Sequence, residues 1–177
     1  MTYIYKWLQF IRERFNPLSY LVMIFVFLGA HYSVYLYYFK PPAGNVTIQT
    51  LIALLPLVAA IYIFFFMLRL FDEVKDFESD LIHYPNRPLP RGLFKINDVI
   101  KLIFVTMAVE VILFSLYGLW ALVSSALAVG YSWLMYKEFF SRQWLRSHLT
   151  TYAVTHTLVA VFISTTIFTA LTKKPPT

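Results

Sequence analysis

Long apolar runs alternate with shorter polar stretches along this chain. Residues 18 to 39, 46 to 68 and 149 to 172 carry no charge, and a transmembrane helix needs about 20 apolar residues. Residues 102 to 136 hold one charge, Glu110, and are too long for one crossing, so we expect a break at Tyr117 and Gly118. The pattern predicts five spans, at about 18–39, 46–71, 99–117, 119–137 and 149–172.

Proline and glycine residues divide the apolar runs further. Pro41, Pro42 and Gly44 are expected to end the first span, and Pro56 to kink the second. Glu110 lies inside the third span, where an ionised carboxylate is costly, so its side chain is expected to face the bundle.

Composition agrees with this reading. The 177 residues are 59% hydrophobic and 14% charged, and none is cysteine. A soluble domain carries roughly a quarter charged residues, so a soluble globule and a disordered chain are both excluded. Without cysteine, disulfides, thiolate metal sites and thiol nucleophiles are excluded as well. The expected fold is an all-α, polytopic transmembrane helical bundle in one domain, residues 1–177.

The formal net charge is +6, and the cations alternate between the two sides of the predicted spans. Short cytoplasmic loops are enriched in Lys and Arg. We therefore expect an integral protein of the plasma (inner) membrane with a cytoplasmic N-terminus, an outside C-terminus, lipid partners and no nucleic acid. The cytoplasmic side would hold Lys6, Arg12, Arg14, Arg69, Lys75, Arg87, Arg91, Lys95, Lys101, Lys137, Arg142 and Arg146, and the other side Lys40, Lys173 and Lys174.

Acidic residues gather directly after the second span, in the predicted cytoplasmic segment 69–101. If the helix continues, Asp72, Asp76 and Asp80 lie at i, i+4 and i+8 on one face, with Glu73 beside them. Like charges at this spacing repel, which indicates a cation among them, and carboxylates suit Mg²⁺. The alternative is a solvated acidic face.

A proline-rich turn follows the acidic stretch and carries two arginines, Arg87 and Arg91, in the run from Asn86 to Gly92. Guanidinium groups facing a metal-loaded carboxylate cluster would suit a diphosphate, because metal and arginine together neutralise the charge of a leaving diphosphate. The alternative is that these arginines only set the topology.

The acidic stretch from Asp72 to Asp80 and the turn Asn86-Arg-Pro-Leu-Pro-Arg-Gly92 together resemble the first aspartate-rich motif of the UbiA superfamily of intramembrane prenyltransferases. The resemblance implies Mg²⁺-dependent transfer of a prenyl group from a prenyl diphosphate to a lipophilic, aromatic or quinone-type acceptor. It implies Asp72, Glu73, Asp76 and Asp80 as metal ligands, Asp76 and Asp80 as catalytic residues, and Lys75, Arg87 and Arg91 as diphosphate contacts.

The chain departs from the family in one respect. Family members usually have about nine spans and a second aspartate-rich motif, whereas here the acids after Asp98 are only Glu110 and Glu138. The resemblance covers what would be the N-terminal half of such an enzyme. Alternatives therefore stay open: a non-catalytic membrane subunit of a larger complex, one part of a split enzyme with a partner chain, a truncated chain, or a homodimer.

Overall fold

The computed structural model describes residues 3–39 and 48–174, which form an all-α bundle and contain no strand. The predicted fold class is thereby confirmed. The predicted break at Pro41, Pro42 and Gly44 lies outside the described residues. In chain order the elements are α1 (Tyr3–Arg14), α2 (Pro17–Phe39), α3 (Ile48–Lys75), α4 (Phe77–His83), α5 (Ile96–Ser115), α6 (Leu119–Tyr136), the 3-10 turn η1 (Glu138–Phe140), α7 (Arg142–Ser147) and α8 (Leu149–Thr172).

Four helices of the described chain are long and apolar enough to cross a membrane, as expected of an integral membrane protein. They are Pro17–Phe39, Ile52–Lys75, Leu119–Tyr136 and Leu149–Thr172. The remaining predicted span, 99–117, corresponds to α5, which has 20 residues but carries Asp98, Lys101 and Glu110 and is not among these four.

The helix boundaries follow the residues that interrupt helices. α5 ends at Ser115 and α6 begins at Leu119, so the predicted break at Tyr117 and Gly118 is confirmed. Gly118 has a φ of 108°, a conformation that side chains disfavour. Pro56 lies inside α3, which continues through it from Ile48 to Lys75.

The bundle packs most extensively between α6 and α8 and between α3 and α5. Small side chains allow α6 and α8 to approach closely: Ser124 and Ala128 on α6 are buried, as is Thr169 on α8. The Ser124 and Thr169 hydroxyl oxygens lie 2.8 Å apart, within hydrogen-bonding distance. Glu110 is 1% exposed and faces the bundle interior, as predicted.

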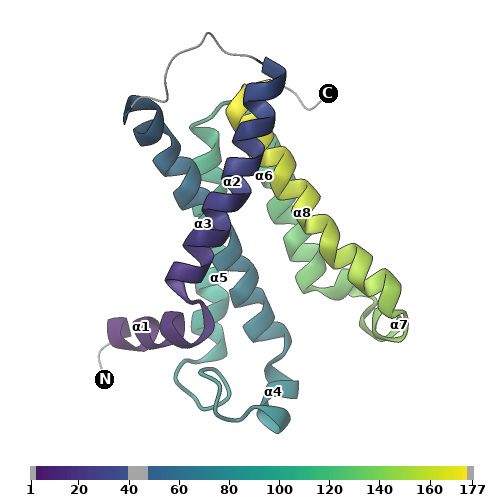
Figure 1. Ribbon diagram of the computed structural model, residues 1–177. Coiled ribbons are helices and arrows are strands. Elements are labelled where there is room, and N and C mark those ends of the chain that lie inside the picture. The colour runs from purple at the N-terminus through teal and green to yellow at the C-terminus, as the bar shows by residue number, and fades with distance from the viewer. Residues whose placement is uncertain (1–2, 40–47, 175–177) are drawn as a thin grey trace.

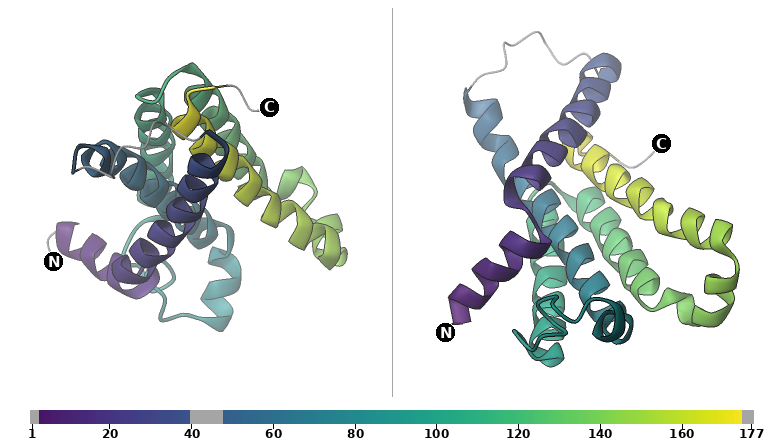
Figure 2. Two further views of the ribbon diagram at one scale, coloured as in Figure 1. Left: turned by 45° about the horizontal axis from the view of Figure 1, so that its top comes forward. Right: turned by 60° about the horizontal axis from the view of Figure 1, so that its bottom comes forward.

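One end of the bundle gathers α1, α4 and the turn between α4 and α5 (Figure 1). Helix α1 lies across the direction of α2 and does not extend it, which the left view of Figure 2 also shows. Aromatic contacts hold α1 there. The ring centres of Trp7 and Phe94 lie 4.1 Å apart, and those of Phe10 and Phe66 lie 6.3 Å apart. These contacts place the C-terminal end of α1 beside the C-terminal end of α3.

Candidate functional site

The acidic stretch leaves α3 through a break in the helix, whereas the predicted common face of its aspartates depended on a continuous helix. α3 ends at Lys75 and α4 begins at Phe77, with Asp76 between them at φ −91° and ψ 1°. The backbone still bonds across the break, from Asp76 N to Asp72 O at 2.9 Å and from Asp80 N to Asp76 O at 2.8 Å. The stretch is thus two helices with a local change of direction at Asp76.

Glu73 is the buried centre of the site, with only 1% of its side chain exposed. Its Oε1 accepts from Arg14 Nε at 2.5 Å and from Arg69 Nη2 at 2.8 Å. Arg69 reaches it from one helical turn earlier in α3, whereas Arg14 comes from the end of α1. Glu73 Oε2 and Arg69 Nε are buried and have no hydrogen-bond partner among the described residues. The cluster therefore keeps one acceptor and one donor that a further group could use.

Asp80 is the second buried carboxylate, and it is paired with Arg87 of the turn. Arg87 Nη1 donates to Asp80 Oδ1 at 2.6 Å and to Oδ2 at 2.7 Å. The guanidinium also lies 4.0 Å from the centre of the Tyr84 ring, as in a cation–π contact. The hydrogen bonds to Asp80 raise the pKa of Arg87, which is charged at every physiological pH in any case.

Arg91 contacts different groups from Arg87. It donates to the backbone oxygen of Asn86 at 3.0 Å and to Glu13 Oε1 at 2.9 Å. This hydrogen bond lowers the pKa of Glu13. The two arginines predicted to bind one diphosphate thus have separate partners, and Arg91 joins the turn to α1.

Asp72 and Lys75 lie on a different side of α3 from Glu73. Lys75 is 3.5 Å from Asp72 and donates to the Tyr152 hydroxyl on α8 at 3.3 Å. Asp72 and Glu73 are adjacent on one helix, and adjacent helical residues point about 100° apart. The predicted set of four carboxylates is therefore divided, and the described residues contain no group of three or more Asp, Glu and His side chains placed to hold a metal.

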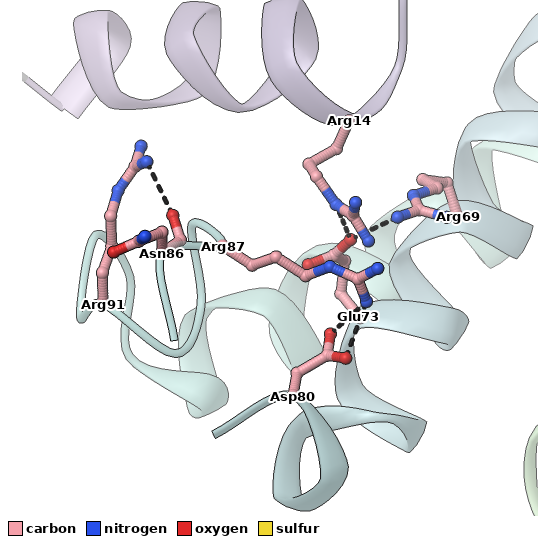
Figure 3. A network of polar contacts seen from close by, with 7 residues as sticks. All are labelled: Arg14, Arg69, Glu73, Asp80, Asn86, Arg87 and Arg91. Atoms are coloured by element: carbon pink, nitrogen blue, oxygen red, sulfur yellow. Dashed lines mark hydrogen bonds and ion pairs between the residues drawn. The ribbon is translucent and has the colours of Figure 1, made fainter. Parts of the chain in front are cut away.

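Figure 3 shows how Arg14, Arg69 and Arg87 point toward Glu73 and Asp80 from three different segments. Three guanidinium groups face two carboxylates, so the cluster has an excess of positive charge. We call these five residues the arginine cluster. Excess positive charge in partly buried surroundings favours an anionic ligand.

A groove of about 350 Å³ borders the arginine cluster. Arg14 and Arg87 line it together with the carboxylate of Glu13 and with polar groups of the turn, among them His83 and Asn86. Two guanidinium groups with neighbouring hydrogen-bonding groups form a suitable surface for phosphate oxygens.

The two buried carboxylates that the structure brings together can be compared with the usual ligands of Mg²⁺. Mg²⁺ is usually bound through one or two carboxylates, with water and substrate phosphates completing its shell, whereas Glu73 and Asp80 are each already ion-paired with arginine. The unpartnered Oε2 of Glu73 is an available carboxylate oxygen. Asp72, with its partner Lys75, stands apart from this pair.

Arg14 and Arg69 are the residues of the arginine cluster that sequence reasoning assigned only to membrane topology. Arg69 pairs with Glu73 one helical turn away, whereas Arg14 is 59 residues from Glu73 along the chain. No motif links the two positions.

The chain matches no known protein family, no curated protein and no solved structure.

Proposed function

We propose that this chain forms the donor-binding part of a UbiA-type prenyltransferase, which transfers a prenyl group from a prenyl diphosphate to a lipophilic acceptor. The observation that carries the proposal is the arginine cluster, which combines buried carboxylates with excess positive charge at one end of a bundle of apolar helices. A ligand with a charged diphosphate and an apolar tail matches both surroundings. The distribution of Lys and Arg along the chain supports placing this end on the cytoplasmic side of the plasma membrane.

The geometry supports distinct roles for the residues of the arginine cluster. Arg14 and Arg87 line the groove and would donate to diphosphate oxygens. Glu73 and Asp80 would hold Mg²⁺, which supplies charge neutralisation to the departing diphosphate. The roles predicted for Asp72, Asp76, Lys75 and Arg91 stay predictions.

The contacts of Arg87 preorganise the site for such a ligand. Asp80 and Tyr84 hold the Arg87 guanidinium in place before any ligand arrives. A donor side chain that is already held in place loses no further freedom when the ligand binds or reacts. This favours binding and reaction.

The proposal is tested by Mg²⁺-dependent release of diphosphate from a long-chain prenyl diphosphate, with the purified chain and several quinone-type acceptors. We expect release that Asp80→Asn and Asp76→Asn abolish. Glu78→Gln is the matched control, because the Glu78 side chain is 83% exposed and its ion pair with Arg142 is long, at 3.8 Å. No release from the native chain, or release that Asp80→Asn and Asp76→Asn leave unchanged, would contradict autonomous catalysis.

A second function is favoured by one specific observation. Glu73 and Asp80 are each already neutralised by arginine, and these ion pairs connect α1, α3 and the turn without a ligand. A network that joins segments in this way suits a non-catalytic membrane subunit of a larger complex. Co-purification with a stable stoichiometric partner that lacks a second aspartate-rich motif would favour this subunit. A partner that supplies the motif would favour a split enzyme.

A further inference from the structure

Helix α1 has an apolar face that the protein covers only in part. Trp7 and Phe10 pack against Phe94 of the turn between α4 and α5. Ile4 and Leu8 lie beside this packed region, and they are 69% and 58% exposed. Two large aliphatic side chains next to each other on one helix face are an unfavourable surface to leave in water.

The connection to α2 fixes where this surface can be. Only Phe15 and Asn16 separate α1 from α2, which is long and apolar enough to cross the membrane. The Asn16 side chain accepts from the backbone N of Leu18 at 3.1 Å and of Ser19 at 3.2 Å, as a cap of α2. Two residues span at most about 7 Å, so α1 cannot lie far from the membrane boundary.

The orientation of α1 agrees with a position along that boundary. It runs across the direction of α2 (Figure 1), so its length follows the membrane surface when α2 crosses the membrane. Interfacial helices carry Trp, Phe and Leu on one face and Lys or Arg on the other. In α1, Lys6 and Arg12 lie about 100° and 140° around the helix from Trp7, the middle of the apolar face. Arg14 lies on that face but is paired with Glu73.

We propose that α1 lies in the plane of the membrane surface, with Ile4 and Leu8 inserted at the boundary between headgroups and acyl chains and with Lys6 and Arg12 at anionic lipid headgroups. The occupant of the exposed face is thus the bilayer itself. The inference does not depend on the proposed transferase function, since it follows from the composition and position of α1.

The absence of cysteine from the chain allows a direct test by single-site spin labelling. The full chain is reconstituted in nanodiscs as Ile4→Cys or as Gln9→Cys, two positions about 140° apart around the helix. We expect the label at position 4 to collide more with oxygen, which dissolves in lipid, than with a water-soluble nickel chelate. We expect the label at position 9 to collide more with the nickel chelate than with oxygen. A label at position 4 that collides mainly with nickel would overturn the proposal, provided that the variant unfolds at the temperature of the unlabelled protein.

The anionic headgroups are tested in the same samples. In nanodiscs of phosphatidylcholine with phosphatidylglycerol, the label at position 4 should lie deeper than in phosphatidylcholine alone. Lys6→Gln with Arg12→Gln should remove most of this difference. Equal depth in both lipids for the chain with its native cations would overturn the role of Lys6 and Arg12, and insertion at neither lipid composition would overturn the proposal as a whole.

Discussion

Arg87 and Asp80 form the most closely held ion pair of the turn, with one guanidinium nitrogen within 2.7 Å of both carboxylate oxygens. The two residues are seven positions apart, and Asp80 is 3% exposed. The pair fixes the proline-rich turn against α4. It also means that the turn and the acidic stretch act as one site and not as two independent motifs.

Arg87→Gln is expected to destabilise the protein by about 1 to 3 kcal/mol, because it leaves the buried Asp80 carboxylate without its cation. Combining it with Asp80→Asn should recover part of that loss, since the pair is then uncharged. Unfolding temperatures of the two single variants and the double variant give the coupling. Glu78→Gln is the control and should change little, because Glu78 is exposed. Additive effects of the two substitutions would show that the pair does not contribute as described.

Arg14→Gln is expected to loosen α1, because it removes the ion pair between Arg14 and Glu73. Hydrogen exchange of the backbone amides of α1 should become roughly tenfold faster, the equivalent of about 1.4 kcal/mol at 25 °C. Arg12→Gln serves as the comparison, since Arg12 is exposed on the same helix. Equal exchange in both variants would mean that the ion pair does not hold α1.

Glu13 gives a pH dependence whose direction follows from its lowered pKa. The hydrogen bond from Arg91 favours the carboxylate, so its contribution is present above the unfolded pKa of Glu13 and is lost as the pH falls through the lower folded value. The unfolding temperature of Glu13→Gln should therefore lie below that of the native chain at neutral pH. The difference should vanish as the pH falls through the lowered pKa of Glu13. A difference that stays constant with pH would exclude this ion pair as its source.

Ser124 tests the close contact of α6 and α8. Ser124→Ala should cost less than about 1 kcal/mol, because interhelical hydrogen bonds in membranes average about 0.6 kcal/mol and Thr169 keeps its bond to Thr166 O. Ser124→Leu should destabilise far more, since the larger side chain would separate the helices. Unfolding in detergent measures both, with Leu127→Ile as a control at a position 59% exposed. Tolerance of Ser124→Leu would contradict the packing described.

The helices could be predicted from the sequence because uncharged runs of membrane length have few alternatives to helix. The break before Leu119 was predicted from Gly118, whereas the break at Asp76 has no proline or glycine to mark it. The spacing of Asp72, Asp76 and Asp80 by four suggested one face. The structure instead brings together Glu73 and Asp80, whose spacing of seven also corresponds to two turns.

Long-range pairs account for the rest of what the sequence could not predict. Arg87 lies close enough to Asp80 in the chain for their pairing to be expected. Arg14 and Glu13 reach the site only because α1 folds back across the end of the bundle. That placement depends on the ring contacts of Trp7 and Phe10, which no local pattern reveals.

We propose that the arginine cluster binds a prenyl diphosphate together with Mg²⁺. The most direct measurement is calorimetric titration of the full chain with an unreactive thio-analogue of farnesyl diphosphate, with and without Mg²⁺, for the native chain, Arg87→Gln and the control Lys101→Gln. We predict Mg²⁺-dependent binding that Arg87→Gln weakens at least tenfold, or about 1.4 kcal/mol, and that Lys101→Gln leaves unchanged. Binding of equal strength in all three proteins, or none to the native chain, would contradict the claim.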